Sequence, residues 1–558
     1  MTDHTTTQTA RDQFVTDMMQ RMATLARTLS DWVTSEPRTL GQIEQQLVRT
    51  IKDLGAAVLA GLCHLTVPAY PSPTVPCACG AQASYQRVRQ ASVKTVLDTI
   101  TIARPYYLCP TCKKGHAPVD QQLSFCAGSI SAGLDELLAL LGASEDSFAE
   151  AASVLEKLTL VAVCPNSVRE ATEQLGQVLI ASELETLDQA QTTTTAPPVR
   201  VPAGPRMYIS MDGMIVHIHD EGWKEIKLGA IYTTTNRASR KRPEKLEVRT
   251  LAQSFVTDLA DASTFGPRVW AEAAQRGVLE ADEVVVLGDG AHWIWNLADQ
   301  YFPGAVQILD WYHASEYVFS AAQAIYGEGS DLAKRWAAEQ LERLWDGKVA
   351  EVITTLQEHL SAGRAVEETL TYYSNQQQRM RYDDYRARGM QIGSGTIESG
   401  CKHVLAARLK QAGMIWDRDG ALAVATVRTW LKSGRWEEAM QLRPSRRRGY
   451  QRRLAACGQV VPVPEMAPEQ VQTSSSAATA APSLAAGIVV GDRGRAAGVR
   501  DRQPEPSQTA LGDATTAALE GGTARRPAAS HPWRKPWSVR QQCRQAEARR
   551  EAQVAPAA

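Results

Sequence analysis

The beginning of the chain carries two runs with helical spacing on either side of a proline. Apolar residues recur every three or four positions over residues 14–32 and again over residues 43–58, which is the spacing of one apolar helix face. Pro37 separates the two runs. The pattern predicts a helical hairpin over residues 12–62, whose apolar faces pack into a core or, as the less favoured alternative, into a dimer.

Shorter patterns follow a proline-rich segment. Residues 92–97 and 99–103 have strand-like alternation and predict a β-hairpin. A helical region comes next, with apolar spacing over residues 134–141 and 148–158 and a third helix that opens at Ser167, where Glu170 completes a capping-box pattern. Helix, short turn and helix is the order of a helix-turn-helix, whose second helix can enter the DNA major groove. Any small helical bundle gives the same pattern.

Beyond a Thr- and Pro-rich linker, three apolar runs each carry an acid. Asp212 lies within the first predicted strand, Asp289 ends the second, and Asp310 follows the third. The second and third runs each lead into a helical pattern, and strands that alternate with helices indicate an α/β sheet. Helical spacing over residues 332–360 then predicts a helical block between this sheet and the rest of the chain.

Length and composition limit the class of protein. A chain of 558 residues predicts about three to four domains, and 44% hydrophobic with 22% charged residues is typical of globular proteins. Fibrous, collagen-like and wholly disordered classes are excluded. The sequence has no apolar run of membrane-spanning length and a polar start, so we expect a cytoplasmic protein with no membrane partner.

Charge is uneven although the net charge is −1. From Arg443 onward there are 18 Lys and Arg against 9 Asp and Glu. A basic tail without apolar periodicity is typical of disorder and is a candidate nonspecific arm for nucleic acid. A merely solvated tail is an equal alternative.

Four cysteines in two close pairs suggest a structural metal. They are Cys77, Cys79, Cys109 and Cys112. Thiolate pairs joined by a hairpin form the tetrahedral Zn²⁺ site of a zinc ribbon. The first pair has one intervening residue where a knuckle usually has two, so His116 or Cys126 could replace a ligand. Buried free thiols are the alternative to a metal site.

Three acids distributed along the α/β region suggest a second kind of metal site. Phosphodiester cleavage with two divalent ions needs several hard carboxylate oxygens from different elements, and Asp212, Asp289 and Glu398 offer such a set. Glu398 opens a Gly- and Ser-rich helix, with Lys402 four residues on along the same predicted face. Each acid could instead cap a turn or form a surface ion pair.

Several strings together resemble bacterial insertion-sequence transposases of the DDE class, most closely the ISKra type. The strings are Ser210-Met-Asp212-Gly213, Gly288-Asp289-Gly290-Ala-His-Trp-Ile-Trp295, Leu309-Asp310-Trp-Tyr-His313, Ile392-Gly-Ser-Gly-Thr-Ile-Glu398-Ser399 and Arg408-Leu-Lys410-Gln-Ala-Gly413-Met-Ile-Trp416. The resemblance implies a ribonuclease H-like catalytic domain with a helical insertion. It also implies that Asp212, Asp289 and Glu398 bind Mg²⁺ or Mn²⁺.

Further roles follow from the same resemblance. Asp310 and His313 resemble the Cys/Asp-x-x-His motif of Mutator-like transposases and, with Lys402, are expected to support catalysis. The implied partners are DNA, as terminal inverted repeats and as target, and a second copy of the chain. The implied reaction frees a 3′-OH at an element end, which then attacks target DNA. A regulatory DNA-binding protein and a nuclease without strand transfer are the alternatives.

These expectations describe a multidomain α+β and α/β protein. We expect these segments: a helical hairpin (1–66), a zinc-ribbon-like module (67–130), a helix-turn-helix-like region (131–190), a linker (191–205), a ribonuclease H-like domain (206–436, with a helical insertion over about 320–385) and a basic tail (437–558). Trp293, Trp295 and Trp311 lie beside the acids and could stack on an unpaired base, although core packing is expected for at least two of them.

Overall fold

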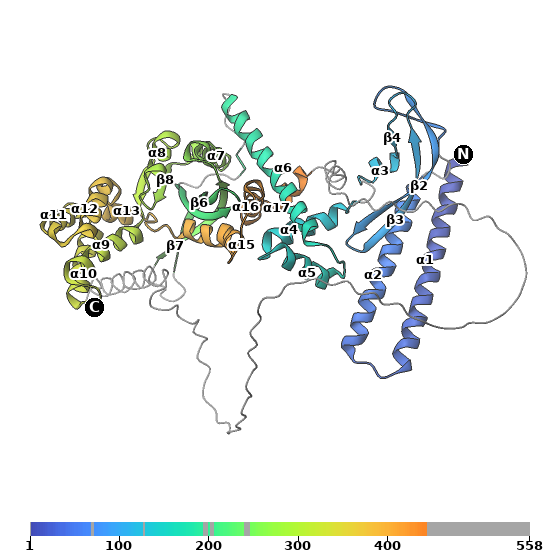
Figure 1. Ribbon diagram of the computed structural model, residues 1–558, viewed down its shortest axis with the longest axis horizontal. Helices are drawn as coiled ribbons and strands as arrows, with labels where there is room; N and C mark the ends of the chain where they lie inside the picture. The colour runs from blue at the N-terminus through green and yellow to red at the C-terminus, as the bar shows by residue number, and fades with distance from the viewer. Residues whose placement is uncertain are drawn as a thin grey trace, which may run out of the picture. The chain divides into compact units, whose positions relative to one another are not determined.

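The computed structural model describes residues 2–67, 72–125, 129–192, 199–200, 206–238 and 246–443 (Figure 1). It is mixed α and β, with many helices and two sheets, which agrees with a multidomain α+β architecture. Cys126, most of the predicted linker and tail residues 444–558 lie outside the described residues. Among the helices that are described, none combines the length and apolar character needed to cross a membrane.

The first two helices are α1 (Thr2–Ser35) and α2 (Leu40–Leu65). Thr39 and Gln42 form a capping box that starts α2. The C-terminal half of α2 packs through Ala56 and Leu59 against a small β-sheet. Much of the apolar pattern stays in solvent, since Ile51 of α2 is 58% exposed. Core packing therefore accounts for only one side of this hairpin.

The small sheet contains both cysteine pairs. It is antiparallel in the order β1 (Thr74–Pro76), β2 (Gln82–Thr95), β3 (Asp98–Leu108), β4 (Gly115–His116), and the short helix α3 (Pro118–Gln122) follows it. The hairpin predicted from residues 92–103 is present with longer strands, and it turns at Asp98, whose φ is +117°. The two long strands place the β1–β2 turn beside the β3–β4 turn.

Three helices then connect the small sheet to the rest of the chain: α4 (Ala132–Ser144), α5 (Phe148–Thr159) and α6 (Pro165–Thr192). The predicted start of α6 at Ser167 is wrong. Pro165 occupies the first turn, where its fixed φ suits a helix start, so Ser167 lies inside the helix. Farther along α6, Gly176 lies against the backbone of Ala423, and an added Cβ would come within 2.3 Å of that carbonyl oxygen.

The second sheet is the centre of the molecule's largest core. Its strands run in the order β7 (Leu246–Asp258), β6 (Gly222–Ala238), β5 (Arg206–Ile218), β8 (Glu283–Gly288), β9 (Val306–Leu309). The β7–β6 and β6–β5 pairs are antiparallel, whereas β5–β8 and β8–β9 are parallel. The sequence pattern predicted β5, β8 and β9 but neither β6 nor β7.

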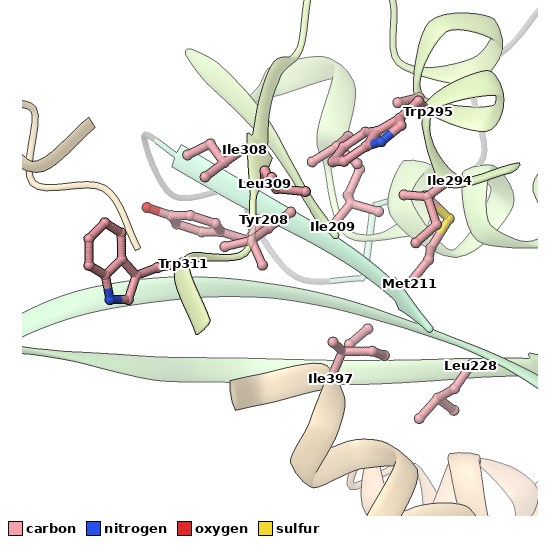
Figure 2. Packing of buried hydrophobic residues seen from close by; sticks show 14 of the residues in the cluster. Tyr208, Ile209, Met211, Leu228, Ile294, Trp295, Ile308, Leu309, Trp311 and Ile397 are labelled. Carbon is pink, nitrogen blue, oxygen red and sulfur yellow. The ribbon is translucent and has the colours of Figure 1, made fainter. Parts of the chain in front are cut away.

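Helices complete this region. They are α7 (Ala262–Gln275), α8 (His292–Tyr301), α9 (Trp311–Tyr326), α10 (Asp331–Trp345), α11 (Val349–Glu358), α12 (Arg364–Gln376), α13 (Tyr382–Ala387), α14 (Gly395–Gly400), α15 (Ala407–Leu409), α16 (Arg418–Lys432) and α17 (Trp436–Leu442), with short 3-10 turns at Val278–Glu280, Leu360–Ala362 and Gln377–Arg379. A π-helix, η4 (Cys401–Ala406), continues α14. Figure 2 shows Ile294 and Trp295 of α8 and Ile397 of α14 reaching the sheet from opposite sides.

Candidate functional site

Asp212 and Asp289 occupy equivalent positions on neighbouring strands. The parallel β5–β8 pairing ends with Ser210 opposite Leu287, two residues before Asp212 and Asp289, and the charge of Asp289 acts on Asp212. Adjacent strands lie about 4.8 Å apart. Side chains alternate between faces along β5, and Met211 lies beside Ile294 in Figure 2. Asp212 therefore belongs to the opposite face, where α14 packs.

The environment of Asp212 is that of a buried acid with few neutralising partners. Its Oδ1 accepts a hydrogen bond of 2.7 Å from the Gly213 N–H. Burial raises the pKa of Asp212 to about 6, and the negative charge of Asp289 adds to this rise, while hydrogen bonds from Gly213 and the Cys401 thiol oppose it. A nearby cation would stabilise the ionised form of this carboxylate.

The turn that carries Asp289 is held by the helical block. Gly290 has a φ of +105°, and an added Cβ would lie 2.7 Å from the Tyr372 ring, so both the backbone and the space require glycine. From α12, the Tyr372 hydroxyl donates to the Asp289 carbonyl oxygen at 2.5 Å, and Gln376 donates to the Gly290 carbonyl oxygen at 3.1 Å. The helical block thus positions the second acid.

Glu398 is joined to the other acids through α14 and the segment before it. Ser394 Oγ donates to Glu398 Oε1 at 2.8 Å, and the Ser394 N–H donates to Asp310 Oδ1 at 2.6 Å. The Cys401 thiol lies between Asp212 and Glu398, and burial together with these two carboxylates raises its pKa well above the ordinary value. Ser394 and Cys401 were not singled out as site residues from the sequence, although both lie in its Gly- and Ser-rich motif.

Asp310 is fully buried, and hydrogen bonds from the protein occupy both of its oxygens. Oδ2 accepts from the His313 N–H at 2.8 Å and pairs with His313 Nδ1 at 2.7 Å, while Oδ1 accepts from Ser394. Burial lowers the pKa of His313, but its hydrogen bond and charge interaction with Asp310, with a further contribution from Asp289, outweigh that effect and raise the pKa to about 9.

Two groups of possible metal ligands occur among the described residues. In one of them, the ligand atoms of Asp310, His313 and Glu398 all lie within 4.8 Å of one another. Asp212, Asp289 and Glu398 do not form such a group together. A protonated His313 has no free lone pair for a metal, and Asp310 already accepts three hydrogen bonds from the protein, so this group is better suited to hold Glu398 in place than to enclose an ion.

The acids that remain for a metal are Asp212, Asp289 and Glu398. They offer hard oxygen ligands, which Mg²⁺ and Mn²⁺ prefer. The half-buried and mutually repelling pair of Asp212 and Asp289 is an arrangement that a divalent cation would stabilise. Two ions about 3.5 to 4 Å apart can share such ligands without every carboxylate lying within reach of the others. The donor set fits such ions.

The segment after Glu398 carries two basic residues in different surroundings. Lys402 lies at the start of the π-helix that continues α14, and it is exposed. Arg408 is buried and donates to the Gly142 and Asp146 carbonyl oxygens. The positive charge of Arg408 therefore serves internal packing.

The expectation that at least two of the three tryptophans near the acids pack in the core is confirmed. Trp295 and Trp311 are buried at 3% and 5% exposure, so at least two of the three pack in the core. Trp293 is partly buried and contacts Phe265 edge-on.

The second group of possible metal ligands is the cysteine cluster. Neighbouring Sγ atoms lie 3.5 to 3.6 Å apart: Cys77 to Cys112, Cys77 to Cys79 and Cys79 to Cys109. A tetrahedral Zn²⁺ with Zn–S distances of about 2.3 Å holds its sulfurs roughly 3.8 Å apart. Hydrogen bonds from the Cys112 backbone lower the pKa of Cys109 to about 6. Four sulfurs in this spacing form a possible closed metal site.

The alternative ligand His116 lies next to this cluster. Its Nε2 is 3.1 Å from Cys77 Sγ. It is not in the group whose ligand atoms all lie close together, so the four cysteines form the better ligand set and His116 is suited to donate to a thiolate. The short first cysteine pair does not prevent the cluster, because the turn closes through the Gly80 N–H to the Cys77 carbonyl oxygen at 2.9 Å.

Comparison with known families places most of the chain in one of them. Residues 39–443 match the uncharacterised protein family UPF0236. This chain belongs to the UPF0236 family. The matched range contains both the cysteine cluster and the three acids. No curated protein matches the chain.

Proposed function

We propose that this UPF0236 protein is a DDE transposase that binds the ends of its insertion sequence and catalyses metal-dependent cleavage and strand transfer of DNA. The observation that carries the proposal is that Asp212 and Asp289 lie near each other at neighbouring strands of the central sheet, while the Cys401 thiol interacts with both Asp212 and Glu398. The acids come from the middle strand, from the end of the neighbouring parallel strand, and from a helix packed on the face to which Asp212 belongs.

The strand order supports a ribonuclease H-like catalytic domain. In order of sequence the strands are arranged 3-2-1-4-5, with the first three antiparallel and the last two parallel. Asp212 on the first strand and Asp289 after the fourth lie side by side as the register requires. The helical block between β9 and α14 separates these acids from Glu398 in sequence, and it holds the Asp289 turn in place.

The proposed chemistry divides between the ions and the chain. Divalent ions, when bound, activate the attacking oxygen and stabilise the leaving oxygen. Asp212, Asp289 and Glu398 would hold the ions. Ser394 fixes one oxygen of Glu398, Tyr372 fixes the backbone at Asp289, and Asp310 orients His313. These contacts keep the ligands in place before substrate binds, which catalysis by positioning requires.

DNA recognition is assigned to the cysteine-containing sheet and helices α4 to α6. Zn²⁺ bound by Cys77, Cys79, Cys109 and Cys112 would join the two turns of a zinc-ribbon-like module. The first turn of α6 is the part suited to a groove, since Arg169 is 45% exposed there. Farther along, Gly176 of this helix packs closely on Ala423, so the helix also serves as a support for the catalytic region.

The test is incubation of the full-length protein with Mg²⁺ and labelled DNA carrying the ends of the element that encodes it. We expect cleavage that leaves a 3′-OH at the element end and joined products with target DNA. The matched control is Asp289→Asn, which should bind the same DNA without cutting it. Cleavage without joining would favour a nuclease, and specific binding without either product in the wild type would favour a regulatory protein.

A further inference from the structure

A polar cavity of about 390 Å³ lies beside α14, next to the proposed catalytic acids. It lies between edge strand β7, helix α14 with its π-helical continuation, and the end of α16. The polar side chains that line it are Thr250, Gln253, Gln391, Thr396, Ser399, His403 and Lys432. Ser399 directly follows Glu398, so the cavity and this one acid share a short helix.

The backbone of β7 departs from a regular strand at this cavity. The β6–β7 register shifts between Ile231 and Thr233, and Ala252 on β7 has a φ of +43°. A bulge of this kind inserts a residue and re-aims neighbouring side chains, often beside functional sites, and a positive φ at a residue with a side chain costs about 1 kcal/mol or more. The guanidinium of Arg276 donates to the Ala252 carbonyl oxygen and holds the bulge in place.

The chemistry of the lining suits an anion joined to a hydrogen-bonding group. Within the described residues no carboxylate lines the cavity, and no ion pair is formed there by Lys432. The hydroxyls of Thr250 and Thr396 lie 2.9 Å apart at its wall, and Phe255 and Val404 add apolar surface. The cavity thus contains hydrogen-bond donors suited to a phosphate. It also contains an apolar wall and amide groups suited to a base.

One amide of the lining has an unused acceptor. Gln391 Nε2 donates to the Gly393 carbonyl oxygen at 2.8 Å, which fixes the orientation of the amide. Its Oε1 is buried and accepts no hydrogen bond from the described part of the chain. A buried acceptor without a donor costs about 1–3 kcal/mol, and an N–H group of a bound ligand would remove that cost.

We propose that this cavity binds one unpaired nucleotide of the DNA substrate, with its phosphate at Lys432 and its base against Phe255, Gln253 and Gln391. The inference rests on the proposed function and names a further binding site beside it. A volume of 390 Å³ falls at the lower end of the range for small-molecule sites, roughly 300–1,000 Å³. This volume suits a single nucleotide that has left the duplex.

The test uses binding without catalysis. Full-length protein in buffer without added Mg²⁺ is titrated with a single-stranded oligonucleotide that carries one 2-aminopurine, and with a duplex of the same length, while anisotropy and 2-aminopurine fluorescence are recorded. We expect Lys432→Ala to weaken single-strand binding about tenfold, equivalent to about 1.4 kcal/mol, and to lower the salt slope by about 0.7. Duplex binding should change little.

The matched control is Lys334→Ala, which removes one exposed positive charge from α10 without touching the cavity. Equal losses of single-strand affinity in Lys432→Ala and Lys334→Ala would overturn the proposal. A 2-aminopurine signal that stays unchanged in Gln253→Ala and Thr396→Val would overturn it as well. Photocrosslinking of the wild-type protein to an oligonucleotide with one 5-iodo-deoxyuridine gives an answer even if a variant fails to fold. Crosslinks should map to residues 250–255 or 391–404, and crosslinks found only elsewhere would contradict the assignment.

Failure of this inference is distinguishable from failure of the proposed function. If the wild-type protein cleaves and joins DNA but Lys432→Ala binds single strands normally, the nucleotide site is contradicted and the transposase function is supported. Absence of cleavage, joining and any DNA binding in the wild-type protein would remove both.

Discussion

The cysteine cluster and the acid cluster are both candidate metal sites, but they are built in opposite ways. All four cysteines lie on two turns of one small sheet, and their sulfurs are already spaced for a single tetrahedral ion. The three acids come from a strand, a strand end and a distant helix, and Tyr372, Ser394 and Asp310 hold the surrounding backbone and side chains. The first arrangement is closed and local, whereas the second is open and depends on the whole domain.

This difference teaches what each site is suited to do. Four thiolates around one ion leave no position for a substrate, so the cysteine cluster suits a structural role. Buried carboxylates that repel one another leave ligand positions open, and ions held there can bind a further oxygen. The comparison predicts that damage to the acids changes chemistry with little change in folding, and that damage to the cysteines does the reverse.

The largest effect is expected for the acids themselves. Asp212→Asn, Asp289→Asn and Glu398→Gln each remove a ligand charge, so cleavage and joining should fall by more than the roughly 10- to 100-fold that loss of a supporting partner costs. Zinc content and DNA-end binding should be retained. A substantial residual rate in any of the three would show that this acid is not a metal ligand.

The cysteines should show the reverse outcome. Protein purified without chelator should contain about one zinc per chain, and replacing Cys109 and Cys112 together by Ser should remove it, because structural zinc contributes folding free energy. Hydrogen exchange should then rise in β1 to β4 and stay unchanged in β5 to β9. Soluble, well-folded wild-type protein that contains no zinc would contradict this prediction.

Asp310 tests whether the second acid position is correctly assigned. Asp310→Asn should impair catalysis less than Asp289→Asn, because both oxygens of Asp310 already accept hydrogen bonds, from Ser394 and His313. It should impair folding more, since breaking a buried charged pair costs about 3–5 kcal/mol. Chemical denaturation and single-turnover cleavage, measured on both variants, would reveal a reversed order.

The same contrast explains how much of each site the sequence predicts. Cysteine spacing is local, so Cys109 and Cys112 indicated a metal before any fold was known. Apolar runs also indicated the two strands that place Asp212 and Asp289, because such runs are typical of buried strands. The supports were not predictable, since Tyr372 meets Asp289 only through tertiary packing of α12.

The errors have the same origin. Strands β6 and β7 were not predicted because their polar and charged residues hide the alternation that a buried face imposes, and β7 is also an edge strand. The burial of Arg408 could not be predicted either, because a charged residue gives no sequence signal for burial. In the fold its guanidinium lies over Phe148 and Trp416, contacts between segments that are far apart in the sequence.

A smaller effect is expected from a matched pair of tyrosines on α12. Tyr372→Phe removes the hydrogen bond to the Asp289 carbonyl oxygen, and Tyr373→Phe removes one of 2.7 Å to the Ala314 carbonyl oxygen. Each should cost about 1 kcal/mol of folding free energy. Only Tyr372→Phe should slow cleavage, by up to about tenfold. Equal rates in the two variants would show that the helical block does not position Asp289.

The smallest effect separates the two sites by pH. Without added Mg²⁺, His313 has a folded-state pKa of about 9 against an ordinary value of 6.5, so its stabilisation is complete below pH 6.5 and is lost as pH rises through 9. For one titrating group, the free energy of unfolding changes by at most about 1.4 kcal/mol per pH unit. Asp212 acts in the same direction at lower pH, because its raised pKa of about 6 exceeds the ordinary 3.8.

The zinc-bound cysteines should instead lose stability as pH falls, since protonated thiols release the metal. The free energy of unfolding of the central sheet is therefore measured by denaturation between pH 6.5 and 9. Its slope with pH should disappear in His313→Gln and remain in His219→Gln, which alters an exposed imidazole. An unchanged slope in both variants would show that the Asp310–His313 pair contributes nothing to folding.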